Sequence, residues 1–275
     1  MKREIVKRAL AGEALNDLNI VDAHCHLHNL YEYYNPEAKI DDMVEEADRI
    51  GISYFCISPI EGIFSSPDLG NRHMKEAIMK YPDRVKGYMV INPNFPELYD
   101  SMFDTYYNLG GVLGIKIHPT AHNYNLCDEN YIKAFDRVND LGGIVLSHSW
   151  QSAPSCSVDL CEQVIKAYPK IPFIIGHSGG TTEGILKSIS VVNKYENAYM
   201  DTCGTFLSCI RIEEMAAKAD SGKILFSSDS PYHDPRVELC NILLADIEDD
   251  LKINMLGGNF RKMLNSCIKP GINEQ

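Results

Sequence analysis

The feature of this sequence that most constrains its fold is a regular alternation of short apolar runs with helical patterns. Eight runs rich in β-branched and aromatic residues begin between 25 and 33 residues apart. The runs are NIVDAH from Asn19, ISYFCI from Ile52, VKGYMVI from Val85, VLGIKIH from Val112, GIVLSH from Gly143, PFIIGH from Pro172, NAYMDT from Asn197 and KILFSSD from Lys223. Near-continuous apolar strands that alternate with helices indicate a parallel sheet with covered faces. Eight such units favour a closed (β/α)8 TIM barrel, with an open doubly wound sheet as the alternative.

The stretches between these runs have helical patterns, as at residues 40–49 and 71–80. A third, 128–141, opens with Asp128 and stops before Gly142, which is a usual start and stop signature. The length of 275 residues suits one barrel of roughly 250. No linker or charge block divides the chain, so the sequence predicts a single domain over 1–275, with a loose end at 269–275.

Composition limits the partners of this chain. A net charge of −12 disfavours nucleic acid, because an acidic surface repels phosphate. No apolar run approaches the roughly 20 residues of a membrane span, and the charged residues 1–19 predict a short amphipathic helix rather than a signal peptide. Nine cysteines without a C-x-x-C pair are typical of reduced thiols in a cytoplasmic protein. We therefore expect a small-molecule substrate, with no membrane or nucleic acid partner; association into a homo-oligomer stays open.

The motif HCH ends the first predicted strand. Residues two apart in a strand point to the same side, so His24 and His26 face together while Cys25 points away. The carboxyl ends of barrel strands are where active sites are built. Two imidazoles on one rigid strand can bind one metal ion, although an H-x-H pair alone is a weak signal.

Other polar residues fall at the ends of later predicted strands. His118 ends the fourth run, His148 the fifth, His177 the sixth and Asp229 the eighth. These ends converge on one face of a barrel. Each residue alone could satisfy a local hydrogen bond, but burial does not require all of them at strand ends. The pattern predicts a divalent-metal site, with zinc as the first choice and Mn, Fe or Co as alternatives.

Lys116 lies two residues before His118, one layer deeper in the barrel. A buried lysine is costly unless it pairs with an anion or loses its charge. Lys116 could bind a substrate carboxylate, bridge two metals after carboxylation, or form a salt bridge to a neighbouring strand. His28 shares the parity of His24 and His26 but follows the strand, so we treat it as a pocket residue only.

A competing motif is G-x-S-x-G at 176–180, the nucleophile elbow of serine hydrolases. Ser178 would then need Asp201 as its acid and His233, the only later histidine, as its base. That interpretation leaves HCH, IKIHP and LSHS unexplained, and no HGGG-type segment precedes the motif. The glycines otherwise indicate a tight turn or an anion-binding nest.

In order, VDAHCH, GIKIHP, LSHS, IGHSGG and LFSSDSPY resemble the amidohydrolase superfamily, and most closely its amidohydrolase 2 branch of TIM-barrel metal-dependent hydrolases and related decarboxylases. The resemblance runs from Val21 to Tyr232. It implies one or two divalent ions, with Lys116 at the place of a carboxylated lysine in binuclear members. Trp150 would line the substrate pocket, as in some decarboxylases. The residues that the resemblance places at or beside the metal are His24, His26, His148, His177 and Asp229.

The resemblance implies metal-assisted hydrolysis of an amide, lactone or ester. Asp229 would take a proton from the activated water, and His177 would act beside it. The alternatives are decarboxylation at the same metal, a TatD-like deoxyribonuclease suggested by DSPY, and a barrel that binds metal or a small molecule without turnover. Substrate choice is expected in loop side chains, such as Phe64, Asn94, Phe206 and His233.

Overall fold

The structure, a computed structural model, describes residues 2–30, 35–36, 38–204, 207–267 and 269. Eight parallel strands are hydrogen-bonded in chain order, from β1 to β8. The strands are β1 (Ile20–Leu27), β2 (Ile52–Pro59), β3 (Val85–Val90), β4 (Val112–Ile117), β5 (Ile144–Ser147), β6 (Phe173–Ile175), β7 (Ala198–Asp201) and β8 (Ile224–Leu225). All eight predicted runs contain a strand, which confirms the (β/α)8 TIM barrel rather than the open sheet.

The ring closes between β1 and the segment that follows β8. The Ala23 N–H donates to the Phe226 carbonyl at 3.0 Å. The Asp229 N–H donates to the His24 carbonyl at 2.9 Å, and the His26 N–H to the Ser230 carbonyl at 2.7 Å. These bonds fix the segment that carries Asp229 directly beside the HCH motif.

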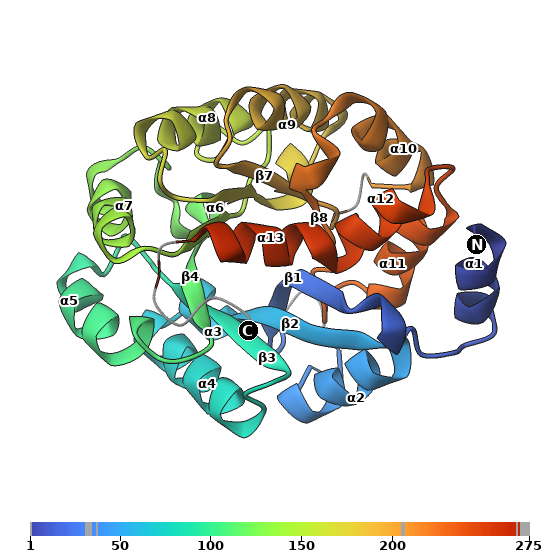
Figure 1. Cartoon of the computed structure of the whole chain (residues 1–275). Coiled ribbons are helices and arrows are strands. Elements are labelled where there is room, and N and C mark those ends of the chain that lie inside the picture. Colours follow the sequence, from blue (N-terminus) through green and yellow to red (C-terminus); the bar gives the residue numbers. More distant parts are fainter. Residues whose placement is uncertain (1, 31–34, 37, 205–206, 268, 270–275) are drawn as a thin grey trace.

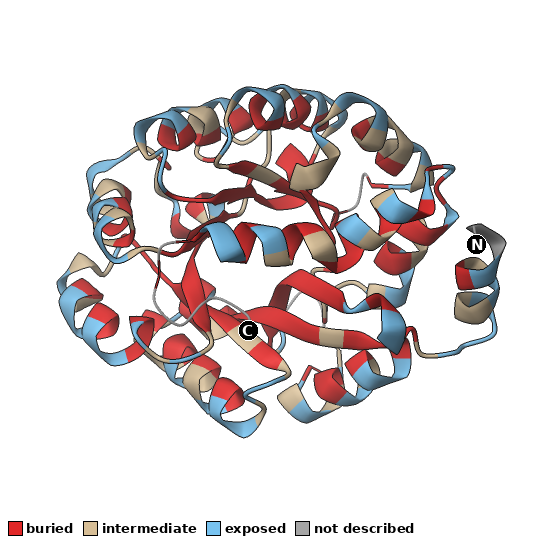
Figure 2. Ribbon diagram, in the orientation of Figure 1, coloured by how far each residue is buried: buried red, intermediate tan, exposed pale blue. Residues whose placement is uncertain are grey.

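Helices surround the strands, as Figure 1 shows. They are α1 (Lys2–Leu10), α2 (Ile40–Ile50), α3 (Ile60–Phe64), α4 (Pro67–Lys80), α5 (Tyr99–Met102), α6 (Pro119–His122), α7 (Glu129–Leu141), α8 (Val158–Ala167), α9 (Thr182–Lys194), α10 (Cys209–Lys218), α11 (Pro235–Leu244), α12 (Asp249–Ile253) and α13 (Asn259–Ser266). The outer helices bury the face toward the strands and expose the other, while the strands are almost wholly buried (Figure 2). This is the amphipathic pattern that the sequence predicted. No helix in the described part of the chain is long and apolar enough to cross a membrane.

Helix α13 closes one end of the barrel. Figure 1 shows it lying across the opening. Phe260 and Met263 pack with Val21, Tyr88 and other inward-facing strand residues in a buried cluster. The Asn259 side chain donates to the Ile224 carbonyl at 2.8 Å, which fixes the helix to the start of the barrel. With that end filled by side chains, the opposite end, where the strands finish, is the one available to a site.

The C-terminal end departs from the prediction at one residue. Lys269 is buried, and its Nζ donates to the Tyr107 carbonyl at 2.7 Å and also to the Val112 carbonyl. The loose end predicted for 269–275 is therefore wrong at Lys269, because two carbonyls beside β4 offer acceptors to its ammonium. Residues 270–275 lie outside the described part of the chain.

Candidate metal centre

The HCH motif faces the end of the barrel where the strands finish. His24 is fully buried, His26 lines a cavity, and Cys25 packs outward against the hydrophobic core. Val21 and Ala23 belong to the barrel interior, so the alternation of sides slips by one residue between Ala23 and His24. The register of β1 against β2 shifts in this stretch. This irregularity lets β1 supply both interior packing and two inward imidazoles.

Both ring nitrogens of His24 have a polar partner. Its Nε2 lies 2.5 Å from Lys116 Nζ and 3.7 Å from Asp229 Oδ1. Because the ammonium of Lys116 can only donate, Nε2 accepts and Nδ1 carries the proton. Nδ1 then donates to Asp201 Oδ2 at 2.9 Å. Burial, aided by Lys116, lowers the pKa of His24 well below its usual value, so the ring is neutral.

His26 presents the same nitrogen to the cluster. Its Nδ1 lies 2.9 Å from the Ser58 carbonyl, which only accepts, so the proton sits on Nδ1. Nε2 then faces Asp229 Oδ1 at 3.1 Å. The imidazole and the carboxylate thus meet in a buried setting. A carboxylate or carbonyl behind each imidazole is the usual arrangement around a metal-binding histidine.

Asp229 and His177 both have left-handed backbone conformations, with φ of 62° and 56°. Such conformations are uncommon outside glycine and cluster at functional sites. Burial alone would raise the pKa of Asp229, but His177, His26 and His24 hold it well below its usual value. Burial lowers the pKa of His177 to about 4. At neutral pH the site therefore offers the carboxylate of Asp229 and the neutral imidazoles of His24 and His177.

The donor atoms of four residues, namely His24, His177, Cys203 and Asp229, all lie within 4.8 Å of one another. Ligands of one ion at 2.0–2.3 Å lie about 3 to 4 Å apart, so small side-chain shifts suffice. Asp229 Oδ1 and Asp201 Oδ1 are buried and accept no hydrogen bond among the described residues. This mixed N, O and S set fits a zinc-type divalent ion.

Lys116 lies at the bottom of the cluster. Its side chain is completely buried, and burial lowers its pKa to about 8 against the opposing effects of Asp229, Cys203 and Asp201. The contact with His24 Nε2 uses the lone pair that a metal would need. Metal binding to His24 therefore requires Lys116 to move, to lose its proton or to be carboxylated.

A stack of flat rings forms one wall above the cluster. The His118 and His148 rings lie 3.8 Å apart at an angle of 10°, and Trp150 is nearly parallel to His148 at 6.4 Å. The His148 ring is 4.8 Å from that of His177, so His148 lies one ring away from the four clustered donors. His118 Nδ1 accepts the Ala121 N–H at 3.2 Å.

The rings line a cavity of about 210 Å³ together with His26, His177 and Asp229. Its wall also includes Phe64 and His233, two of the loop residues expected to select the substrate. Asn94 is not among its lining residues; the Asn94 side chain donates to the His122 carbonyl at 2.8 Å instead. Phe206 lies outside the described residues.

His28 lies outside the lining of this cavity as well. β1 ends at Leu27, and His28 has a φ of 71°, so strand parity no longer sets the direction of its side chain. His28 Nδ1 contacts Glu61 Oε1 at 2.7 Å. Its expected place as a pocket residue is therefore wrong for the central cavity.

The serine-hydrolase alternative is contradicted. Ser178 is buried in the turn η4 (Gly176–Gly179), and its hydroxyl donates to the Asp201 main-chain carbonyl. His233 instead contacts Glu238, with Nδ1 3.4 Å from Oε1. The required triad is not assembled, and a nucleophile elbow belongs to an open sheet rather than a barrel.

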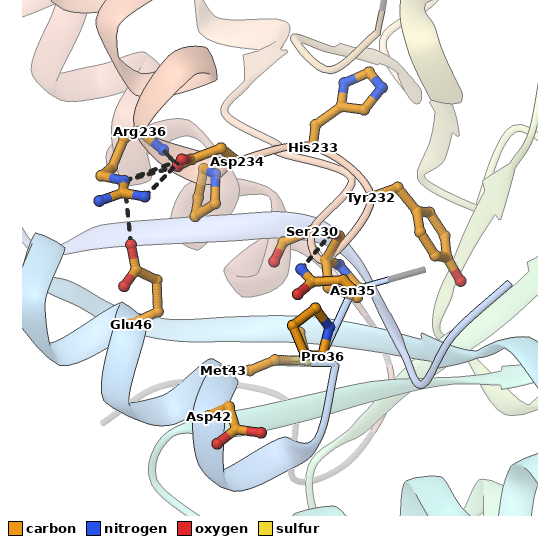
Figure 3. A pocket seen from close by; sticks show the side chains of 12 residues that line it. Asn35, Pro36, Asp42, Met43, Glu46, Ser230, Tyr232, His233, Asp234 and Arg236 are labelled. Atoms are coloured by element: carbon orange, nitrogen blue, oxygen red, sulfur yellow. Dashed lines mark hydrogen bonds and ion pairs between the residues drawn. The ribbon is translucent and has the colours of Figure 1, made fainter. Parts of the chain in front are cut away.

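A larger cavity of about 350 Å³ lies on the outer side of the segment after β8 (Figure 3). Three of its charged residues form ion pairs: Arg236 contacts Glu46 at 3.2 Å and Asp234 at 2.7 Å. Tyr232 and His233 line both this cavity and the central one. Because His26, His177 and Asp229 line the central cavity and not this one, we place the chemistry there.

Two residues of the centre were not predicted in their roles. Cys203 follows β7, and its Sγ lies 3.5 Å from Nδ1 of both His24 and His177. Asp201, considered only as a triad acid, ends β7 and orients His24. The signal available was position: NAYMDTC ends the seventh strand, as the histidine motifs end others.

The sequence profile of the amidohydrolase family matches residues 21–265. The chain therefore belongs to this family, as the motifs indicated. No curated protein matches the chain at a significant level.

Solved structures confirm the fold. A 2,6-dihydroxybenzoate decarboxylase from Rhizobium superimposes with a TM-score of 0.68 at 14% identity, over 89% of this chain and 98% of that one. A dihydroxybenzoic acid decarboxylase from Polaromonas with bound manganese gives 0.68 at 14%, over 89% and 96%. A probable 2-pyrone-4,6-dicarboxylic acid hydrolase from Acinetobacter baumannii gives 0.64 at 18%, over 89% and 98%. At these identities the likeness shows the fold alone.

Proposed function

We propose that this chain is a metal-dependent hydrolase that cleaves an amide, lactone or ester bond in a small molecule. The observation that carries the proposal is the convergence of His26 Nε2 and Asp229 Oδ1, 3.1 Å apart beside His24. A divalent cation bound here would take all three side chains as ligands. Membership of the amidohydrolase family supports the same conclusion.

The proposed ligands are His24, His26, His177 and Asp229, with Cys203 and His148 near them. A divalent cation held there would polarise a substrate oxygen and lower the pKa of a water toward about 7. Asp229, which is ionised, would accept a proton from the attacking water and return it to the leaving group. His177 would position the substrate carbonyl. Lys116, once neutral, would be able to add carbon dioxide with release of a proton, and the resulting carbamate would be a ligand for a second ion.

The cavity wall favours an uncharged substrate. Leu30, Ile60, Ile63 and Phe64 supply apolar surface. Burial lowers the pKa of three lining histidines, His118, His148 and His177. The described lining residues include no lysine or arginine that would bind a phosphodiester, so a deoxyribonuclease is disfavoured.

The test is a panel of lactones, esters and amides offered to zinc- or manganese-loaded protein in ¹⁸O-labelled water. We expect one class to be cleaved, with one labelled oxygen in the product carboxylate. A chelator should abolish turnover, and added metal should restore it. Metal-loaded protein that cleaves none of these bonds would contradict the proposal.

Decarboxylation is a second candidate, favoured by the flat ring wall. His118, His148 and Trp150 are nearly parallel and suit an aromatic acid laid against them. Asp229 or His177 would then protonate the ring carbon as carbon dioxide leaves. Release of carbon dioxide from a hydroxybenzoate, without label from water in the organic product, would favour this reaction over hydrolysis.

A further inference from the structure

We propose that His28, Glu61 and His73 form a second metal site, which takes a zinc-type divalent cation on the outer side of the central cavity wall. His28 follows β1, Glu61 is the second residue of α3, and His73 lies in the middle of α4. The loop after β1 and helices α3 and α4 thus each contribute one ligand. This inference does not depend on the reaction catalysed at the central cluster.

The potential ligand atoms of these three residues lie close together and contact one another. Glu61 Oε1 lies 2.7 Å from His28 Nδ1 and 3.6 Å from His73 Nδ1. The two imidazole rings are 4.8 Å apart and nearly perpendicular, at 82°. One donor atom from each residue lies within 4.8 Å of the others. Two histidines and a carboxylate with an open position are a common ligand set for Zn²⁺.

The hydrogen bonds within this cluster leave two of its polar atoms without a partner. Glu61 Oε2 and His73 Nδ1 are buried and have no hydrogen-bond partner among the described residues. A buried polar atom without a partner costs free energy comparable to a lost hydrogen bond. A cation bound to Glu61 and His73 would satisfy both atoms at once, whereas protonation of His73 alone leaves Glu61 Oε2 unpaired.

The backbone of His28 has an energetically unfavourable conformation that neighbouring residues maintain. Its φ of 71° is unfavourable for a residue with a side chain, and such strain persists only where surrounding contacts impose it. The His28 N–H donates to the Ala38 carbonyl at 3.0 Å. Its carbonyl accepts from the Tyr232 hydroxyl at 3.4 Å. These bonds present the imidazole to Glu61 before any ion arrives.

An ion has access to the cluster from solvent. A cavity of about 300 Å³ is lined by His28, His73 and Glu76, among other residues. Glu76 follows His73 by three residues on α4, so both project from the same face of the helix. Glu76 or water can therefore occupy the open position. Lys80, on the same cavity, is already paired with Asp41 at 2.6 Å.

Such a site would stabilise the wall of the central cavity. Leu30, two residues after His28, lines that cavity, as do Ile60 and Ile63 on either side of Glu61. Figure 1 shows α3 and α4 beside the strands that follow β1. A cation that joins His28 to Glu61 and His73 would hold the loop and α3 together.

The test compares zinc content after chelation, reconstitution with Zn²⁺ and desalting. Relative to wild type, His73→Ala should lose one equivalent of zinc, and Glu61→Gln should lose one as well. Arg72→Ala, the neighbouring exposed position on α4, is the matched control and should keep the wild-type content. In protein whose central site is removed by His24→Ala and His26→Ala, Zn²⁺ should still raise the unfolding temperature, because it binds the folded state. Adding His73→Ala should abolish that rise.

Equal zinc content in wild type and folded His73→Ala would overturn the proposal. Should His73→Ala fail to fold, Glu61→Gln, which keeps the shape of the side chain, decides in the same way. If wild type binds zinc only at His28, Glu61 and His73 and none at the central cluster, the result contradicts the proposed function and leaves this proposal standing. The two failures are therefore distinguishable.

Discussion

At the scale of single residues, the centre depends on which nitrogen of each imidazole carries the proton. Ser58 and Asp201 accept from Nδ1 of His26 and His24, so both Nε2 atoms lie toward Asp229, and that of His24 also contacts Lys116. Asp229 lines the cavity, and its pKa is held well below the usual value. In the proposed reaction it is therefore the base.

Asp229→Asn keeps the shape of the side chain but removes its ability to accept a proton. We expect turnover to fall by at least about 10²-fold, the lower end of general-base contributions, with part of the metal retained. Steady-state kinetics and metal analysis on the same sample check this. Asp234→Asn, in the same segment but paired with Arg236, is the control and should leave turnover within about 2-fold, as surface changes usually do. Unchanged turnover in Asp229→Asn would remove Asp229 from this role.

At the scale of elements, the strands could be predicted because each is a short apolar run between polar helix surfaces. The ends of β1, β4, β5, β6 and β8 could be predicted as a site because histidines or an aspartate stand there. The slip of alternation after Ala23 and the left-handed turn at His177 could not, because tertiary contacts set them. Cys203 could not be predicted as a site residue because a single cysteine forms no motif with a distinctive spacing.

Gly180 illustrates how a turn positions a cavity wall. Its φ is +68°, and an added Cβ would lie 2.0 Å from the ring of Trp150. We expect Gly180→Ala to destabilise the fold by about 1–3 kcal/mol and to displace Trp150. Because Trp150 is the only tryptophan, its fluorescence reports the movement. Gly110→Ala, with no atom within 4 Å of the added Cβ, is the control. An unchanged emission spectrum in Gly180→Ala would contradict this account of the wall.

The buried amine of Lys269 makes the free energy of unfolding depend on pH. Burial lowers its pKa to about 7, against an ordinary value of 10.5. Between these values the unfolded chain holds the proton more tightly, so the cost of burying Lys269 is full below about pH 7 and falls as pH rises. Relative to Lys269→Met, wild type should gain about 2 kcal/mol of stability from pH 7 to 9, at up to 1.36 kcal/mol per unit. Urea unfolding of both proteins measures the difference. A difference independent of pH would show that the amine is not buried as described.

At the scale of the whole molecule, the residues that stabilise the barrel and the residues of the candidate site lie at opposite ends. The interior cluster and α13 fill one end, while the polar residues gather at the other. Rim residues therefore contribute little to the core. The family and the fold could be predicted from ordered motifs, but substrate choice could not, since it depends on how loops from distant strands meet around one cavity.

The central claim is that a divalent metal binds at the HCH motif, and metal content tests it most directly. His24→Ala with His26→Ala removes two ligands from one strand. We predict that this variant unfolds cooperatively, as wild type does, yet loses at least one equivalent of metal and all turnover, whatever the His28–Glu61–His73 site holds. A folded double variant with the full metal content of wild type would contradict the account.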